Sequence, residues 1–417
     1  MERYNGKNKG MLKDVAATEN NQNWQYMIRR ENEFTNTDHD VRSYFQKDYT
    51  RVLYSNAYKR MKNKTQVFFS PTNDHICTRI EHVNLVESIS YTIAKELGLN
   101  VELTRAIAVA HDIGHGPFGH KGERILNEIA NRDCQKTFWH EKNGLNCVDN
   151  IELLEDGDGF KNNLNLTYAV RDGIISHCGE VDDSKIYPRW EAIDLNERYL
   201  KPAEYQPYTW EGCTVKISDK ISYVGRDIED AIRFNILTIE EIEELKRILK
   251  IEEIGYKKLN NTNIVNLLIG EVLSNVSIRE GFSFSQEGLD LLNNIKQFNY
   301  KHIYGCERVI QSDDYFKLVL NKIYEVLKSI YNVNTHMIEV GNKKILYPRV
   351  INGFLNWLGD YSYQDYFIED KKHLEILKNK KLFNIENEKD YHWAIINYIA
   401  GMTDNMAIKM FNEIISF

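Results

Sequence analysis

Histidines gather in one stretch of this chain, between residues 79 and 141, and an aspartate directly follows one of them. Five of the twelve histidines lie there. They are His82, His111, His115, His120 and His140, with Asp112 beside His111. Imidazole nitrogens and carboxylate oxygens are the ligands that divalent transition metals bind. Because so many inward-facing polar groups would be costly to bury without a ligand, the stretch predicts a metal site.

Two helices are expected to position the first of these residues. From residue 82 to residue 97 the apolar side chains recur at helical spacing, and Gly98 is a natural stop. Asn100 is a suitable N-cap for a second helix, whose inward stripe ends on His111. His111 therefore points where the core residues point. Asp112 can face the same ion because glycines and a proline break the helix just downstream.

A second chemical pair follows on the next expected helix. Glu123 lies three residues after His120, so the two side chains share a helix face. A carboxylate beside an imidazole fixes the tautomer of the ring and raises its basicity, as a general acid or base requires. The alternative is that Glu123 only interacts with the helix dipole in the first turn. The spacing alone does not decide between these two interpretations.

A third group lies on a helix expected over residues 214–231. Asp219, Tyr223 and Asp227 are spaced i, i+4 and i+8, which places them on one helix face. Asp219 would be a second carboxylate ligand, completing a metal site with His82, His111 and Asp112. The alternative is a solvated polar face. His177, near the end of a helix expected over residues 164–177, is interpreted as a structural histidine outside the cluster.

Composition narrows the class of protein. Six prolines in 417 residues, with long stretches of helical period, favour a mostly α fold. The net charge of −8 argues against a protein that coats nucleic acid by bulk electrostatics, although it allows a local basic groove. The six cysteines are scattered without a C-x-x-C pair, as in reduced proteins. With no signal peptide and no long apolar run, we expect a cytoplasmic protein without a membrane segment.

The organisation along the chain is expected to be simple. Residues 1–23 are predicted to be a flexible N-terminal arm, residues 24–238 the catalytic core, and residues 239–417 a helical C-terminal region packed on that core. Residues 40–64 are predicted to be one helix, ending in a basic group of Lys59, Arg60, Lys62 and Lys64. This group is either a solvated face or a phosphate-facing edge.

Two short hairpins and one long loop are also expected. Residues 65–69 and 75–80 flank a turn, which would deliver Arg79 and His82 to the site together. A second hairpin is expected over residues 336–346, around Gly341 and Asn342. Residues 180–210 suit an irregular loop.

These residues carry a family resemblance. His82, the pair His111-Asp112, and Asp219 resemble the metal-binding pattern of the HD-domain phosphohydrolases. Residues 48–66, 78–82, 111–120, 219–231 and 400–404 further resemble the deoxyguanosine triphosphate triphosphohydrolase (dGTPase) family. The resemblance runs through most of the chain. It implies an all-α HD-domain phosphohydrolase fold with one or two small β-hairpins.

The resemblance also implies an activity and roles for residues. The activity would be metal-dependent hydrolysis of deoxynucleoside triphosphates, dGTP or several dNTPs, to deoxynucleoside and inorganic triphosphate. One divalent ion (Mn, Mg, Fe, Ni, Co or Zn) would be held by His82, His111, Asp112 and Asp219. His120 with Glu123 would be the acid–base pair, and His115 and His140 would contact the α-phosphate. The substrate-binding residues would be Arg51, Arg60, Gln66, Arg79, Lys220, Tyr223 and Asp227.

Within that set the resemblance assigns finer roles. Arg79 and Lys220 would meet the phosphates, and Gln66 and Asp227 would hold the sugar 3′-hydroxyl. Tyr223 would pack where a ribose 2′-hydroxyl would go.

Partners and alternatives follow from the same comparison. The resemblance implies a homo-oligomer, a hexamer or a tetramer, and leaves open a nucleotide or single-stranded DNA effector. One alternative is another HD-type nucleotidase or phosphodiesterase, which would not release intact triphosphate. Another is a nucleotide- or nucleic-acid-sensing subunit, although such a subunit does not require His120 and Glu123.

Overall fold

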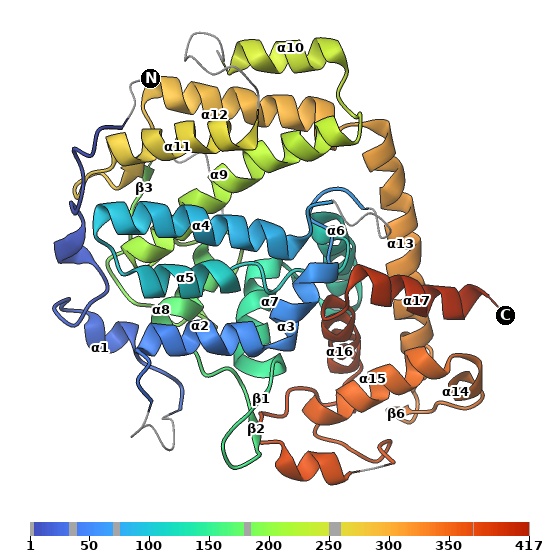
Figure 1. Ribbon diagram of the computed structural model, residues 1–417. Coiled ribbons are helices and arrows are strands. Elements are labelled where there is room, and N and C mark those ends of the chain that lie inside the picture. The colour runs from blue at the N-terminus through green and yellow to red at the C-terminus, as the bar shows by residue number, and fades with distance from the viewer. Residues whose placement is uncertain are drawn as a thin grey trace. The chain divides into compact units, whose positions relative to one another are not determined.

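The chain folds mainly as helices (Figure 1). The computed structural model describes residues 4–32, 40–69, 76–178, 185–249, 260–369 and 371–416. In these ranges the strands form three two-stranded antiparallel sheets. They pair β1 (Leu154–Glu155) with β2 (Lys161–Asn162), β3 (Lys185–Ile186) with β4 (Phe282–Ser283), and β5 (Tyr331–Asn332) with β6 (Met337–Ile338). The all-α expectation is confirmed.

The chain divides into two compact units that alternate along the sequence. The first unit comprises Met1–Thr50, Asp74–His111 and Leu166–Gln311, and the second comprises Arg51–Asn73, Asp112–Asn165 and Ser312–Phe417. The sequence predicts a boundary at residue 238 between two domains that are each continuous in the chain, and this boundary stays a prediction. The compact units are instead discontinuous, so each brings together segments that are far apart in the chain.

The first unit is built around four helices that carry site residues. They are α4 (Arg79–Leu97), α5 (Val101–Ala110), α8 (Tyr168–Ser176) and α9 (Trp210–Arg233). Thr78 and Glu81 form a capping box at the start of α4, and Gly98 ends it in the left-handed conformation at φ 79°. The Asn100 side chain caps α5 by accepting the backbone N–H groups of Glu102 and Leu103. These boundaries confirm the helices predicted around His82 and His111.

The rest of the first unit packs around these helices. It contains η1 (Lys13–Val15), α1 (Trp24–Met27), α10 (Ile239–Ile248), α11 (Asn261–Asn275), α12 (Gln286–Phe298) and η5 (Asn299–Tyr304). Residues 4–23 are part of this packing, which corrects the expectation of a flexible arm. Leu12 is fully buried. The backbone N–H groups of Gly10 and Leu12 donate to the carbonyls of Glu96 and Leu97, so main-chain hydrogen bonds hold this segment.

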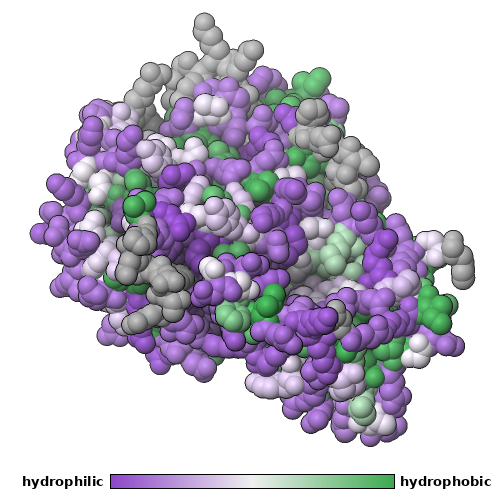
Figure 2. Space-filling model, turned by 60° about the horizontal axis from the view of Figure 1, so that its bottom comes forward, coloured by the Kyte–Doolittle hydropathy of each residue, from purple (hydrophilic) through white to green (hydrophobic). Residues whose placement is uncertain are grey.

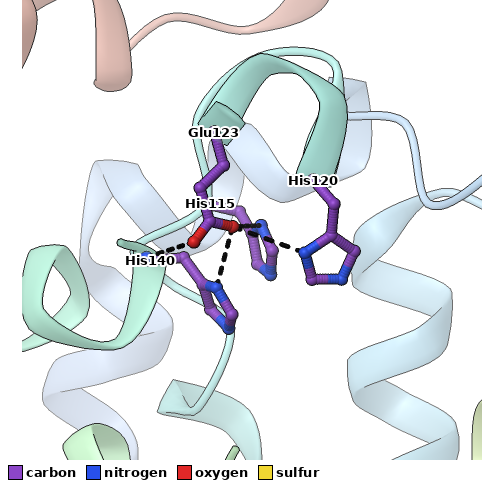
Figure 3. Close-up of side chains that lie close together, drawn as sticks. All are labelled: His115, His120, Glu123 and His140. Carbon is purple, nitrogen blue, oxygen red and sulfur yellow. Dashed lines mark hydrogen bonds and ion pairs between the residues drawn. The ribbon is translucent and has the colours of Figure 1, made fainter. Parts of the chain in front are cut away.

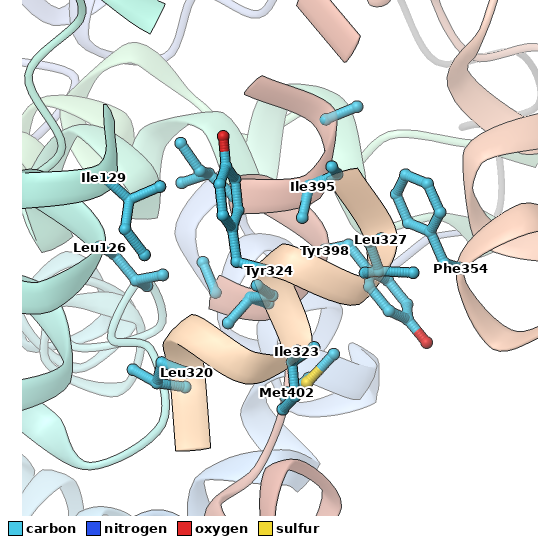
Figure 4. Packing of buried hydrophobic residues seen from close by; sticks show 14 of the residues in the cluster. Leu126, Ile129, Leu320, Ile323, Tyr324, Leu327, Phe354, Ile395, Tyr398 and Met402 are labelled. Atoms are coloured by element: carbon cyan, nitrogen blue, oxygen red, sulfur yellow. The ribbon is translucent and has the colours of Figure 1, made fainter. Parts of the chain in front are cut away.

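The second unit has its own hydrophobic core (Figure 4). Its helices are α3 (Asn56–Arg60), η2 (Met61–Asn63), α6 (Gly119–Ile129), η3 (Ala130–Cys134), α7 (His140–Asn146), η4 (Cys147–Ile151), α14 (Lys343–Leu346), α15 (Pro348–Tyr361), η6 (Lys372–Ile376), α16 (Glu388–Ala400) and α17 (Asp404–Ile415). Two more helices, α2 (Tyr44–Tyr54) and α13 (Glu307–Lys328), run from one unit into the other along the chain. Leu126 of α6, Leu320 of α13 and Ile395 of α16 are fully buried in this core. The C-terminal helices therefore hold α6, which carries His120 and Glu123.

Three expected elements differ from the structure. The helix predicted over residues 40–64 breaks at Ser55, whose side chain accepts the backbone N–H of Tyr58 and starts α3. Of the first predicted hairpin, Thr65 and Thr78 each take part in a β-bridge, but the segment 65–69 forms no strand, and residues 70–75 lie outside the described residues. The second hairpin precedes Gly341 and Asn342: it pairs Tyr331–Asn332 with Met337–Ile338, and its turn contains His336 in the left-handed conformation (φ 54°).

The face seen in Figure 2 is mostly hydrophilic, with hydrophobic residues exposed in small patches. Across the part of the chain that the structure describes, no helix combines the length and apolar character needed to cross a membrane.

Candidate metal centre and acid–base cluster

Three of the predicted metal ligands converge within the first unit. His82 comes from α4, His111 caps the C-terminus of α5, and Asp219 comes from α9. Nε2 of His82 lies 3.0 Å from Oδ1 of Asp219, and Nε2 of His111 lies 4.0 Å from the same oxygen. Both imidazoles are buried. This arrangement meets the expectation that separated helices bring imidazole and carboxylate ligands together.

Hydrogen bonds to Nδ1 determine the tautomer and the orientation of these two imidazole rings. Nδ1 of His111 lies 2.7 Å from the carbonyl oxygen of Ala108, which can only accept, so Nδ1 carries the proton. The Ser222 hydroxyl donates to the Asp219 carbonyl, so Nδ1–H of His82 donates to the Ser222 oxygen at 3.3 Å. In both rings Nε2 is left with its lone pair. Metal-binding histidines are commonly oriented in this way.

Asp112 follows His111 directly and begins the next segment of the second unit. Its buried carboxylate oxygen Oδ1 lies 3.3 Å from Nε2 of His115. Asp112 as a fourth ligand stays a prediction, supported by its adjacency to His111.

His177 does not fit its predicted place outside the cluster. It lies at the C-terminus of α8 and is buried. The ring centroids of His177 and His111 are 4.9 Å apart. The sequence spacing gave no indication of this, because α8 is more than fifty residues from α5 and meets it only through tertiary packing.

The second unit contains a cluster of three imidazoles around one carboxylate (Figure 3). Oε2 of Glu123 lies 3.0 Å from Nδ1 of His140, 3.4 Å from Nδ1 of His120 and 4.0 Å from Nδ1 of His115. The rings of His115 and His140 stack with centroids 3.8 Å apart. The predicted pair of His120 and Glu123 is therefore brought together, with His140 as a closer partner of the carboxylate.

The three imidazoles differ in their exposure to solvent. The side chain of His120 is 69 % exposed, whereas those of His115 and His140 are buried. Burial alone would raise the pKa of Glu123, but the charge of His140, hydrogen bonds with His120 and His140, and the charge of His115 together lower that pKa well below its usual range. Glu123 is therefore ionised at neutral pH and can orient an imidazole that exchanges protons.

The turn that carries His115 requires a close backbone approach. A Cβ on Gly114 would lie 2.1 Å from the carbonyl oxygen of His140 and 2.1 Å from the backbone nitrogen of Gly144. Only glycine allows this turn to pack against α7. The Asn143 side chain donates to the Gly114 carbonyl at 2.7 Å, which completes the contact. The same glycine that was expected to break the helix thus also places His115 beside His140.

Asp404 is a buried residue whose importance only the structure makes clear. Its Oδ2 accepts the backbone N–H of Thr65 at 2.8 Å and also the Thr65 hydroxyl, and its Oδ1 accepts the backbone N–H of Phe118 at 2.9 Å. Thr65 precedes Gln66, and Phe118 lies between His115 and His120. One carboxylate therefore ties two segments that carry candidate site residues to the start of α17.

We expect Asp404→Ala to destabilise the protein and to lower its activity. Each buried backbone N–H left without an acceptor costs about 1–3 kcal/mol, and two such groups lose their acceptor here. Denaturant unfolding of the variant and of Asp314→Ala, a change at an exposed aspartate of the same unit, measures the effect. Equal free energies of unfolding in the two variants would show that Asp404 does not hold these segments.

Four of the predicted substrate-binding residues lie in the first unit. Arg79 is buried at the start of α4, and Lys220 and Tyr223 are partly buried on α9. The single continuous helix α9 confirms that Asp219, Tyr223 and Asp227 share one face.

Asp227 has a partner that the sequence did not indicate. Its Oδ2 accepts the hydroxyl of Tyr304 at 2.5 Å, from η5. Burial raises the pKa of Asp227 to about 7, although the Tyr304 hydrogen bond and the charge of His82 act in the opposite direction. Tyr304 is separated from Asp227 by 77 positions, and no helical or strand spacing links them.

The other three predicted substrate-binding residues lie in the second unit. Arg51 donates to the carbonyls of Leu164 and Asn163, and Arg60 pairs with Glu152 at 2.5 Å, so both make structural contacts. Gln66 has a buried Oε1 for which the described part of the chain supplies no hydrogen-bond partner. The basic group does not form one solvated face: Lys59 and Lys62 are exposed, whereas Lys64 is buried and donates to the His115 carbonyl.

Comparison with known proteins matches two parts of the chain to domain families. The HD domain family matches residues 79–224, and the phosphohydrolase-associated domain family matches residues 364–413. A deoxyguanosinetriphosphate triphosphohydrolase-like protein of Caldanaerobacter subterraneus is 30 % identical over 376 residues, covering 90 % of this chain and 86 % of that protein. The chain belongs to this dGTPase-like family of HD-domain proteins.

Further members of the dGTPase-like family are similar to large parts of this chain. Those of Desulfatibacillum aliphaticivorans and Rickettsia felis are 33 % identical over 288 residues and 28 % identical over 387 residues. The first alignment covers 68 % of this chain and 73 % of the relative, and the second covers 90 % and 92 %. The HD domain match includes every predicted metal ligand, and the phosphohydrolase-associated match includes Asp404. The chain is a metal-dependent phosphohydrolase of the HD type.

The residues present fit a divalent metal. In the first unit, two Nε2 lone pairs and a carboxylate oxygen face one another, an arrangement of acceptors that a cation stabilises. Imidazole and carboxylate together suit first-row transition ions, so the donor set is compatible with the Mn, Fe, Ni, Co and Zn among the metals expected from sequence.

Proposed function

We propose that this phosphohydrolase cleaves deoxynucleoside triphosphates, dGTP or several dNTPs, to deoxynucleoside and inorganic triphosphate. The observation that carries the proposal is the convergence of His82, His111 and Asp219, with both Nε2 atoms presented toward the carboxylate. The names of the dGTPase-like relatives supply the substrate class.

The proposed metal ligands are His82, His111, Asp112 and Asp219. A divalent ion bound there lowers the pKa of a water molecule and polarises a phosphoryl oxygen. Arg79 and Lys220 offset the charge of the triphosphate.

His120 is the proposed acid that protonates the leaving 5′-oxygen, because it is the exposed member of the cluster. Glu123 orients its ring, with Oε2 3.4 Å from Nδ1. His115 and His140 are proposed to contact the α-phosphate. Their stacked rings and the hydrogen bond between His140 and Glu123 support a fixed orientation for both imidazoles.

The sugar is proposed to be held by Gln66 and Asp227 at its 3′-hydroxyl, with Tyr223 packed against C2′. Tyr304 would keep the Asp227 carboxyl in place through their hydrogen bond. Arg51 and Arg60 are proposed to support this region indirectly, since their hydrogen bonds go to the chain itself.

Incubation of the purified protein with each dNTP and each rNTP, in Mn²⁺ or Mg²⁺, tests the proposal. Intact triphosphate and deoxynucleoside are the expected products. Release of orthophosphate or pyrophosphate, or cleavage of a phosphodiester instead, would identify another HD-type nucleotidase or phosphodiesterase. Nucleotide binding without turnover in any metal would identify a sensing subunit.

Tyr223→Ala is expected to relax sugar selectivity. A tyrosine ring against C2′ leaves no room for a 2′-hydroxyl, so the ring excludes ribonucleotides by steric conflict. In the variant, kcat/KM for GTP relative to dGTP should rise, and dGTP binding should weaken through lost packing. Kinetics with both nucleotides for wild type and variant measure the ratio. An unchanged ratio, or a wild type that hydrolyses GTP as well as dGTP, would show that Tyr223 does not select the sugar.

The assembly and regulation remain proposals that rest on the family resemblance. A homo-oligomer, hexameric or tetrameric, is proposed, with a nucleotide or single-stranded DNA as effector. Light scattering with and without dNTP or a short single strand tests both. The cytoplasmic location stays a prediction from the cysteines, all six of which are free thiols in the structure.

A further inference from the structure

His177 lies beside the metal centre of the first unit. One ligand atom from each of His111, His177 and Asp219 lies within 4.8 Å of the other two. The helix α8, which ends at His177, packs against both α5 and α9, the helices that position His111 and Asp219. His177 is 2 % exposed. The fold therefore brings a third buried imidazole to the carboxylate that His82 and His111 already face.

The hydrogen bonding of His177 is the same as that of His111. Nδ1 of His177 lies 2.7 Å from the carbonyl oxygen of Ile174, three residues earlier, as Nδ1 of His111 lies 2.7 Å from that of Ala108. Each histidine stands just after the last residue of its helix. Because a carbonyl only accepts, Nδ1 of His177 also carries the proton, and Nε2 is the nitrogen with the lone pair. His82, His111 and His177 thus share one tautomer.

We propose that His177 is a further nitrogen ligand of the metal centre, so that the first unit supplies three imidazoles and the Asp219 carboxylate. The HD pattern read from the sequence contains only His82 and His111 as nitrogen ligands. A histidine that only packs in the core needs hydrogen-bond partners for its ring. It needs neither the tautomer with Nδ1 protonated, which metal ligands commonly have, nor a position beside other ligand groups.

A third imidazole determines which class of ion the centre selects. Mg²⁺ prefers an octahedral set of oxygen ligands and retains its water, whereas imidazole nitrogens suit Zn²⁺, Fe²⁺ and Ni²⁺, and Co²⁺ lies beside these in affinity. His177 therefore shifts the preference of the centre from Mg²⁺ toward transition metals. This deepens the proposed function, since it rests on the same metal centre, but it does not depend on which nucleotide is hydrolysed.

The test measures metal binding to metal-free protein in the absence of nucleotide. Calorimetric titrations with CoCl₂ and MgCl₂ compare wild type, His177→Ala and His177→Gln, and the visible absorption of the Co²⁺ forms reports the ligands. The matched control is His392→Ala, which removes a buried imidazole from α16 in the second unit. Thermal unfolding of each metal-free protein checks that it folds. If His177→Ala does not fold, His177→Gln carries the test, because it keeps a polar side chain of similar size without the imidazole.

Loss of His177 should weaken Co²⁺ binding by more than the roughly 10–100-fold that loss of an outer-shell partner causes. It should weaken Mg²⁺ binding much less, and it should change the Co²⁺ absorption spectrum. His392→Ala should change neither. An unaltered Co²⁺ affinity would overturn the proposal and leave His177 as a packing residue. So would weaker Co²⁺ binding in which neither the Co²⁺ absorption spectrum nor the ratio of Co²⁺ affinity to Mg²⁺ affinity changes.

Two further outcomes separate this proposal from the proposed function. Normal Co²⁺ binding by His82→Ala would overturn the metal centre itself, together with the role of His177. Metal binding as expected in all variants, without triphosphate release by the wild type, would overturn the dNTP assignment and leave the His177 assignment intact.

Discussion

Replacing Asp219 with alanine is expected to abolish hydrolysis with every divalent metal added. The Asp219 carboxylate is the group that both His82 and His111 face, with its Oδ1 3.0 Å and 4.0 Å from their Nε2 atoms. Without it, the remaining ligands would hold a dication with one compensating charge fewer. A metal ion contributes several kcal/mol to such a reaction, which corresponds to a fall in kcat of about 10³-fold or more.

The measurement combines steady-state kinetics with elemental analysis of bound metal. Glu229→Ala is the matched control, because it removes from the same helix a partly exposed carboxylate that pairs with Arg226 and Arg233. Ion pairs at the surface contribute little to the stability of the fold, so the control variant should keep wild-type turnover and metal content. Wild-type turnover in Asp219→Ala would mean that Asp219 is not a ligand.

His120→Ala should lower kcat by roughly 10²–10⁴-fold, the usual contribution of general acid–base catalysis, while metal content stays unchanged. His120 is the exposed imidazole of its cluster, and its Nδ1 lies 3.4 Å from the ionised carboxylate of Glu123. Glu123→Gln removes the charge that orients the ring and should lower kcat in the same direction. If the two residues act as a pair, the double variant should lose little more than His120→Ala alone.

Arg124→Ala provides the control for this series, since Arg124 lies on the same helix with a side chain that is 69 % exposed. Its kcat should match that of the wild type. Loss of metal from His120→Ala would assign His120 to the metal instead of to proton transfer. An unchanged kcat in His120→Ala, with a large loss in His140→Ala, would move the acid role to His140, the closer partner of Glu123.

The sequence by itself was sufficient for the features that depend on residues close together in the chain. The helices that carry His82 and His111 could be predicted, because their apolar spacing, Gly98 and Asn100 are local signals that the structure retains. The shared face of Asp219, Tyr223 and Asp227 was predictable for the same reason, since one regular helix fixes their relative directions. The dense histidine cluster pointed to a metal through the cost of burying polar groups.

Sequence patterns gave the wrong local structure where particular hydrogen bonds outweighed the average character of a segment. The helix expected over residues 40–64 breaks because the Ser55 side chain caps a new helix. The N-terminal residues pack instead of remaining flexible, because main-chain hydrogen bonds to the end of α4 hold a segment that is polar in composition. In each case a few directional contacts outweighed an average property of the segment.

Only the tertiary structure decided which distant residues meet. His177 lies against His111, Asp404 holds the backbone of Thr65 and Phe118, and Tyr304 donates to Asp227. These partners are separated by between 66 and 339 positions in the chain. The period of a helix determines which face a residue occupies, but the packing of helices against one another determines what that face meets. The candidate ligands could therefore be predicted from the sequence, whereas the residues that surround them could be identified only from the tertiary structure.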